Sequence, residues 1–287
     1  MNKNDVKLIL KSLGIHPNKK FGQNFLIDEQ LLDKIIKESN IISDDIILEI
    51  GAGLGVLTEK LAEVAKKVYA IEIESVFCGF ISKKLQKHNN VEILQGDALR
   101  LEFPHFNKLV SNIPYSITGP ILEKVFFKRN PPLGILTIEK SLAERIFCKD
   151  DYKTFSRITV SVNSFLNPVK KIDISKNSFF PRPKIDLSLI VLKAKQKIDK
   201  FLQNETTKKF YLRFIAGTMP YKNKNILNAI KYFLKNFNTE IYFEKKIKES
   251  LNSRNLLDKK VFQLTINEFI DIARTIYQFL SYQNERD

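Results

Sequence analysis

The feature that most constrains the fold is an alternation of short apolar runs with amphipathic segments, from about residue 30 to residue 193. The intervening segments carry apolar residues at helical spacing, as Leu57, Leu61 and Val64 do. Strands that alternate with helices in this way form a parallel sheet covered by helices, so the sequence predicts a doubly wound α/β domain. The expected strands cover residues 46–50, 67–71, 91–94, 108–111, 133–138, 165–170 and 187–192.

The last two expected strands differ from the others. The connection between them contains a turn at Pro181 and Pro183 and is too short for a crossover helix, so we expect this pair to be antiparallel. The sequence after residue 200 has helical patterns without convincing strands. We therefore expect an α/β domain over residues 1–193 and a small all-helical domain over residues 194–287.

The charge balance favours a polyanionic partner. The chain has 47 Lys and Arg against 32 Asp and Glu, a net charge of +15. Residues 194–287 hold 18 basic and 10 acidic residues, so this shorter part is about twice as densely positive as the rest. Nucleic acid and an acidic membrane face are both compatible with this excess, as is a surface that is simply rich in lysine.

The scarcity of His and Cys excludes other classes of protein. With 3 His and 2 Cys, widely separated, a zinc site, a disulfide framework and a histidine-based triad are all disfavoured, and we expect no metal. The N-terminus lacks the apolar stretch of a signal peptide, and no later run approaches the length of a membrane span. The sequence therefore predicts a soluble, cytoplasmic protein without a membrane partner.

A glycine-rich turn follows the first expected strand, in the sequence ILEIGAGLG over residues 47–55. Gly51, Gly53 and Gly55 give the spacing GxGxG, whereas the dinucleotide-binding pattern GxGxxG needs a glycine where this chain has Val56. The GxxxxGK[ST] loop of nucleotide triphosphatases is missing as well. The turn resembles the cofactor-binding motif of S-adenosylmethionine-dependent methyltransferases of class I, which have a Rossmann-like fold.

Acidic residues stand at the ends of successive expected strands. Glu49 precedes the glycine turn, Glu72 ends the next strand, and Asp97 follows the third. Ligands bind at this edge of open α/β sheets, where Glu72 would meet ribose hydroxyls and Asp97 the exocyclic amine of an adenine. A capping role for Glu49, and a solvated charge at Glu74 beside Glu72, are the alternative interpretations.

The fourth expected strand ends in Asn112, Ile113, Pro114 and Tyr115. Asn and Pro are common in turns, but the position fits the Asn-x-Pro-Tyr motif of enzymes that methylate exocyclic amino groups of bases. An adenine N6 lone pair is delocalised into the ring, so acceptors must hold the N6 hydrogens to direct that lone pair at a methyl group. The Asn112 side-chain oxygen and the Ile113 carbonyl would accept, while the Tyr115 ring stacks on the base.

Several motifs together resemble one family, the ribosomal RNA adenine N6,N6-dimethyltransferases. They are KKFGQNFL, ILEIGAGLG, QGDA, NIPYSITGPI and SFFPRPK, in family order from Lys19 to Leu192. The resemblance implies four methyl transfers from S-adenosylmethionine to two adjacent adenosines in a hairpin loop near the 3′ end of small-subunit rRNA. The implied partners are this rRNA and the pre-ribosomal small subunit, and the implied oligomeric state is a monomer.

The resemblance also implies roles for individual residues. Phe179 would cover the target base on the face opposite Tyr115, with Phe180 as the neighbour that could take this role instead, and the N-terminal segment 1–30 would act as a lid. The implied catalytic set is Asn112, Ile113, Pro114, Tyr115 and Phe179. The implied cofactor contacts are Gln23, Asn24, Leu26, Glu49, Gly51, Gly53, Glu72, Ile73, Asp97, Ala98 and Asn112.

The C-terminal domain carries the expected RNA contacts. Many members of the family have an arginine-rich stretch early in this domain, whereas this chain reads GTMPYKNKNILNAI at residues 217–230. The tail over residues 251–280 resembles the archaeal and eukaryotic branch more than the bacterial one. The candidates for RNA binding are Lys208, Lys209, Arg213, Lys222 and Lys224.

Three alternatives remain at this stage. An antibiotic-resistance methyltransferase of the Erm type, acting on one adenosine of large-subunit rRNA, shares the fold, the reaction and the NIPY motif. A ribosome-assembly or transcription factor could keep the fold and RNA binding without catalysis. A DNA adenine methyltransferase is disfavoured because the sequence has no recognisable segment for DNA target recognition.

Overall fold

The computed structural model describes residues 1–15, 23–149, 151–235 and 240–284. The chain divides into two compact units, Met1–Glu144 with Leu166–Ala194, and Arg145–Phe165 with Lys195–Asp287. The expected boundary after residue 193 lies one residue from the observed boundary after Ala194. Residues 145–165 were expected in the α/β domain but belong to the helical unit. Part of the reason is a buried hydrogen bond of 2.6 Å between the hydroxyls of Ser164 and Tyr211.

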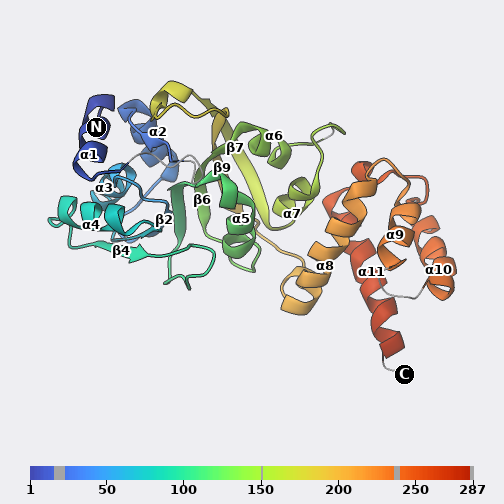
Figure 1. Cartoon of the computed structure of the whole chain (residues 1–287). Helices are drawn as coiled ribbons and strands as arrows, with labels where there is room; N and C mark the ends of the chain where they lie inside the picture. Colours follow the sequence, from blue (N-terminus) through green and yellow to red (C-terminus); the bar gives the residue numbers. More distant parts are fainter. Residues whose placement is uncertain (16–22, 150, 236–239, 285–287) are drawn as a thin grey trace. The chain divides into compact units, whose positions relative to one another are not determined.

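The first unit is built on a seven-stranded sheet with the order β4-β3-β2-β5-β6-β9-β7 (Figure 1). Strands β2 to β6 run parallel, and β9 pairs antiparallel with both β6 and β7. All the expected strands are present, and the antiparallel pair is confirmed. The strands are β2 (Ile46–Ile50), β3 (Lys67–Glu72), β4 (Val91–Gln95), β5 (Lys108–Asn112), β6 (Leu133–Glu139), β7 (Leu166–Ile174) and β9 (Leu187–Ala194).

The central strands are buried and mainly apolar because both faces of the sheet are covered. Ile47 and Leu48 are consecutive, so their side chains point to opposite faces, and both are 0% exposed. Glycine allows one close contact here: a Cβ at Gly134 would lie 2.6 Å from the ring of Phe126. The sequence pattern therefore follows from burial on two faces.

Helices and a small second sheet complete this unit. Helix α2 begins directly after Asp28, because the Asp28 carboxylate accepts hydrogen bonds from the N–H groups of Gln30 and Leu31. Strand β1 (Phe25–Leu26) pairs antiparallel with β8 (Phe179–Phe180). The helices of this part of the chain are α1 (Lys3–Ser12), α2 (Glu29–Ser39), α3 (Val56–Ala62), α4 (Ser75–Lys84), α5 (Thr118–Phe126) and α6 (Lys140–Ile146).

The second unit is helical, as expected. Its core includes the fully buried aromatic side chains of Tyr211, Phe214, Phe233 and Phe269. Among the helices that the structure describes, none is long and apolar enough to cross a bilayer. The helices of this unit are α7 (Arg157–Phe165), α8 (Glu205–Thr218), α9 (Ile226–Leu234), α10 (Glu240–Asn252) and α11 (Ile266–Asn284).

Candidate active site

A cavity of about 430 Å³ opens at the carboxyl ends of β2, β3 and β5. Its volume is in the range of cofactor and substrate pockets in proteins. Most of the site residues expected from the sequence line it, although they come from segments far apart in the chain. They are Gln23, Asn24, Leu26, Gly51, Gly53, Glu72, Ile73, Asp97, Ala98, Asn112, Ile113, Pro114 and Tyr115.

The glycine turn and the NIPY motif touch each other. Gly51 has φ +83°, a conformation that disfavours side chains, and a Cβ on it would lie 3.0 Å from Cδ of Pro114. A glycine at position 51 thus lets the end of β2 approach the segment after β5. The two motifs form adjoining walls of one cavity.

The Glu72 carboxylate orders the glycine turn and the loop after β3, on the side of the cavity where the sequence predicts the cofactor (the cofactor side). Its Oε2 accepts a hydrogen bond of 2.8 Å from the N–H of Gly53, and its Oε1 accepts from the N–H groups of Ile73 and Glu74, at 2.8 and 3.0 Å. Burial nevertheless raises the pKa of Glu72, since desolvation outweighs these bonds. The carboxylate is therefore fixed in orientation at the place expected for a ribose.

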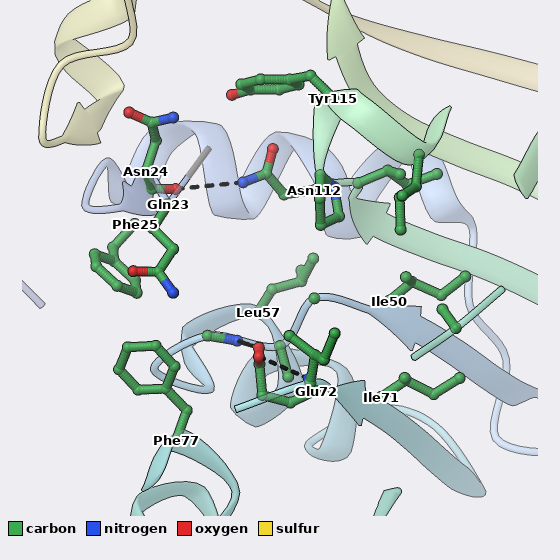
Figure 2. A pocket seen from close by; sticks show the side chains of 18 of the residues that line it. Gln23, Asn24, Phe25, Ile50, Leu57, Ile71, Glu72, Phe77, Asn112 and Tyr115 are labelled. Atoms are coloured by element: carbon green, nitrogen blue, oxygen red, sulfur yellow. Dashed lines mark hydrogen bonds between the residues drawn. The ribbon is translucent and has the colours of Figure 1, made fainter. Parts of the chain in front are cut away.

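The segment before α2 closes another wall of the cavity. The Gln23 amide donates a hydrogen bond of 2.8 Å to the Glu74 carboxylate, so Glu74 has a partner within the protein. The ring of Phe25 meets that of Phe77 edge-on, with centroids 5.6 Å apart, and both rings line the cavity (Figure 2). The residues Lys19, Lys20, Phe21 and Gly22 of the KKFGQNFL motif lie outside the described residues, and the lid role of segment 1–30 stays a prediction.

The loop that carries Asp97 and Ala98 is held from two directions. Oδ1 of Asp97 accepts a hydrogen bond of 2.9 Å from the N–H of Leu99. Lys124 on α5 donates to the carbonyls of Ala98, Leu99 and Leu101 at 2.9, 3.2 and 2.5 Å, and its ammonium lies 4.2 Å from the centroid of the Phe103 ring. Sequence reasoning missed Lys124 because no local pattern distinguishes this lysine from the many surface lysines.

Asn112 has one satisfied and one unsatisfied end. Its Nδ2 donates a 3.5 Å hydrogen bond to the Asn24 carbonyl, while its buried Oδ1 has no hydrogen-bond partner in the described part of the chain. Figure 2 shows the nitrogen directed at the Asn24 backbone and the oxygen on the side of the cavity where the Tyr115 ring lies. A buried acceptor without a partner is expensive, so a donor from a bound molecule would fit here.

The structure places two expected site residues away from the cavity wall. Phe179 is 3% exposed and packs in the hydrophobic core with Leu26, next to Tyr115. Its role in covering the target base needs exposure of this ring and stays a prediction. Glu49 is 2% exposed and lies below the glycine turn near Thr58, where burial raises its pKa to about 8.

The expected RNA-binding residues in the helical unit have unequal surroundings. Lys209, Arg213 and Lys224 are exposed. Lys208 forms an ion pair of 2.5 Å with Glu205. Lys222 donates to the carbonyls at residues 152, 153 and 155, at 2.8, 3.4 and 2.8 Å, so its ammonium already stabilises a loop of its own unit. Lys222 is therefore the weakest phosphate-binding candidate of the set.

Comparison with known proteins identifies the family. The model of the family described as ribosomal RNA adenine dimethylase matches residues 15–274. The chain belongs to this family. The match extends beyond the α/β unit into the helical one.

Relatives of this family member include two archaeal proteins named "Probable ribosomal RNA small subunit methyltransferase A". The one from Thermococcus sibiricus is 36% identical over 266 residues, which cover 92% of this chain and 93% of the relative. The one from Thermococcus gammatolerans is 33% identical over 264 residues, with 92% and 91% covered. These archaeal relatives agree with the resemblance of the C-terminal tail to the archaeal and eukaryotic branch.

Solved structures agree with the class I methyltransferase fold. A dimethyladenosine transferase from Plasmodium falciparum is 30% identical, with a TM-score of 0.77, covering 86% of this chain and 95% of that one. The 23S rRNA methyltransferase ErmE has a TM-score of 0.64 at 23% identity, covering 88% and 98%, and this likeness concerns the fold alone.

Proposed function

We propose that this protein is an rRNA adenine N6,N6-dimethyltransferase that uses S-adenosylmethionine to modify two adjacent adenosines in a hairpin loop near the 3′ end of small-subunit rRNA. The observation that carries the proposal is the buried Oδ1 of Asn112, which lacks a hydrogen-bond partner in the described part of the chain. It lines the same cavity as the backbone loop that Glu72 orders. The family membership and the names of the relatives support the same reaction.

The residues of the cavity fit the cofactor. Glu72, fixed by backbone N–H groups, is placed to accept hydrogen bonds from ribose hydroxyls, and Asp97 to accept one from the adenine amine. Gly51 lets the glycine turn lie directly against Pro114, so the walls proposed for the cofactor and for the target base adjoin. S-adenosylmethionine would supply an electrophilic methyl group on its sulfonium, so the protein needs no metal and no strong general base for the transfer.

The target side of the cavity would hold the adenine. Asn112 Oδ1 accepts one N6 hydrogen, the Ile113 carbonyl accepts the other, and the lone pair is left pointing at the methyl group. The Tyr115 ring would stack on the base, an interaction that contributes about 1–3 kcal/mol per base. Rate enhancement then comes from orientation and from electrostatic complementarity at the nitrogen.

The partners are part of the same proposal. A flipped-out adenosine is accessible in a hairpin loop, which suits small-subunit rRNA or a pre-ribosomal small subunit as the substrate. The resemblance to the family implies a monomer as the working form. Exposed Lys209, Arg213 and Lys224 would contact its phosphates. Both cysteines, Cys78 and Cys148, are free thiols, in keeping with work in the reducing cytoplasm.

The decisive experiment is transfer of tritiated methyl groups from S-adenosylmethionine to immature small subunits, followed by mapping of the labelled nucleotides. We expect label on two adjacent adenosines near the 3′ end. Purified large subunits serve as the control substrate and should remain unlabelled. Label confined to large-subunit rRNA would overturn the proposal in favour of an Erm-type enzyme.

A second measurement separates the enzyme from a non-catalytic factor. Calorimetry should detect S-adenosylmethionine binding to the full chain, and Glu72→Ala should abolish it. A protein that binds immature small subunits but neither binds the cofactor nor transfers methyl groups would be an assembly factor, contrary to the proposal.

A further inference from the structure

A basic groove lies on the first unit, outside the cavity described above. It has a volume of about 600 Å³ and is lined by Lys7 and Lys11 of α1 together with Phe180 and Pro181. Lys3, Lys7 and Lys11 recur every four residues, so they share one face of the helix, and all three are exposed.

The lysines of this face have no carboxylate partner within the described part of the chain. The one acidic residue in the first turn, Asp5, accepts a hydrogen bond of 2.7 Å from the N–H of Asn2 and so completes the helix cap. Like charges four residues apart on a helix repel, so an anion bound along this face would relieve that repulsion.

Phe180 positions two of the ammonium groups. Those of Lys3 and Lys7 lie 5.5 and 5.8 Å from the centroid of its ring, within the range of cation–π attraction. Long lysine side chains otherwise lose rotamer freedom when they bind, so this restraint lowers the entropic cost of binding an anion. The face is therefore organised before any ligand arrives.

The groove is adjacent to the wall of the active-site cavity. The buried side of α1, through Val6 and Leu10, packs in one cluster with Phe25 and Phe77, and both of these rings line the cavity. Phe180 is paired in the small sheet with Phe25. The lysine face is thus separated from the cavity by about the thickness of one helix, roughly 10 Å.

We propose that Lys3, Lys7 and Lys11, held in place by Phe180, bind the sugar–phosphate backbone of the RNA strand that flanks the target adenosine. A flipped adenosine in the cavity would leave its neighbouring phosphates outside it, and the strand that carries them could reach the lysine face across the thickness of α1. Phosphate contacts fix register and orientation without reading sequence, so this surface would hold the strand while Asn112 and Tyr115 hold the base. The inference rests on the proposed function and extends it to an RNA contact outside the helical unit.

The test is the salt dependence of RNA binding by the full-length triple variant Lys3→Gln/Lys7→Gln/Lys11→Gln. Glutamine keeps helix propensity while removing the charge. The probe is a fluorescent RNA hairpin from the 3′ end of small-subunit rRNA with two adjacent adenosines in its loop. The negative slope of log K against log salt should become shallower by about 0.7 for each single-strand phosphate that the variant no longer binds, hence by about 2 for three lysines. The Kd should rise at least tenfold.

A matched control removes the same charge elsewhere. Lys66, Lys83 and Lys87 are exposed. Lys66 precedes β3, Lys83 lies in the last turn of α4, and Lys87 follows that helix before β4. All three therefore lie near the amino ends of the strands, whereas the cavity is at the carboxyl ends. Their triple Gln variant should keep a slope within about 0.5 of the unmodified protein. An equal fall in both variants would mean that only net charge matters and would overturn the proposal.

The remaining outcomes distinguish the two proposals. If the unmodified protein labels small-subunit rRNA but the α1 variant binds the hairpin with an unchanged slope, the RNA surface is wrong and the proposed function stands. If that variant binds the hairpin normally but loses affinity for complete subunits, the lysine face binds another part of the subunit, and its assignment to the strand that flanks the target adenosine is wrong. If no substrate is labelled by the unmodified protein, the proposed function itself fails.

Discussion

The two sides of the cavity differ in how completely their polar groups are paired. On the cofactor side, both oxygens of the Glu72 carboxylate accept backbone hydrogen bonds. On the target side, the Oδ1 of Asn112 is buried and has no partner in the described chain. Both sides belong to one cavity, and the glycine at position 51 brings them into contact.

This difference indicates which side is built for affinity and which for the reaction. A loop whose groups are already paired keeps its shape without a ligand and loses little entropy when one binds. An unpaired buried acceptor costs about 1–3 kcal/mol in the folded protein and is compensated only when a substrate donates to it. We therefore expect changes on the cofactor side to alter binding and changes on the target side to alter turnover.

The largest effect should come from Asn112→Ala, which removes the unpaired acceptor. We expect kcat to fall by about a hundred- to a thousand-fold, as for other groups that act on a developing charge, with RNA affinity nearly unchanged. Single-turnover methyl transfer and separate binding measurements check this. A variant that keeps most of its turnover would show that Asn112 does not orient the N6 group.

The second effect concerns the contact between the two sides. In Gly51→Ala the alanine would have to adopt a φ of +83°, which is strained for a residue with a side chain, and its Cβ would lie 3.0 Å from Cδ of Pro114. Strain of this kind costs about 1–3 kcal/mol, so we expect cofactor affinity to fall about ten- to a hundred-fold and turnover to fall with it. Titration calorimetry and denaturant unfolding measure both.

A matched glycine provides the control for that variant. Gly79 lies inside α4, and a Cβ there would meet nothing within 4 Å. Gly79→Ala should therefore raise the free energy of unfolding by about 0.5–1 kcal/mol and leave cofactor affinity unchanged. Equal loss of affinity in both variants would contradict the contact between the motifs.

A smaller effect is expected from Lys124→Met, which removes the cation that holds the loop of Asp97. We expect the KM for S-adenosylmethionine to rise about five- to tenfold, because the loop loses its three hydrogen bonds to the ammonium group, while kcat at saturation changes less than about twofold. Lys128→Met is the control, since Lys128 lies one turn further along the chain, over the Phe106 ring. A change in kcat alone would place Lys124 on the target side.

The strands and the site motifs were predictable from the sequence because their causes are local. Burial on both faces of a parallel strand produces an apolar run, and Ile47 and Leu48 show that both faces are covered. Gly51 needs a positive φ in whatever surroundings the turn has. Such constraints act on a few consecutive residues, so a single sequence records them.

Other features depend on contacts between distant segments and left no local signal. The bonds from Lys124 to residues 98, 99 and 101 need the final position of α5. The segment 145–165 reads as part of the alternating pattern, yet Ser164 pairs with Tyr211 of the helical unit. The burial of Phe179 follows from the pairing of two-residue strands, too short for any periodicity.

The smallest effect on activity should come from Glu49, the carboxyl group beneath the cofactor side. Burial raises its pKa from 4.5 to about 8 in the folded protein. The folded state therefore holds this proton more tightly, so the free energy of unfolding is highest below about pH 4.5 and falls as the pH rises towards 8. Glu49→Gln mimics the protonated form and should flatten this slope by up to about 1.4 kcal/mol per pH unit.

Denaturant unfolding between pH 5 and 8 measures this slope, and Glu63→Gln, which alters an exposed side chain, is the control. Some slope should remain in Glu49→Gln, because burial raises the pKa of Glu72 in the same direction. Cofactor affinity of Glu49→Gln at pH 7 should change less than about threefold, since the side chain does not line the cavity. A large loss of affinity with an unchanged dependence of stability on pH would instead make Glu49 a direct cofactor contact. The cofactor side would then include this buried carboxyl group beneath the glycine turn as well as Glu72.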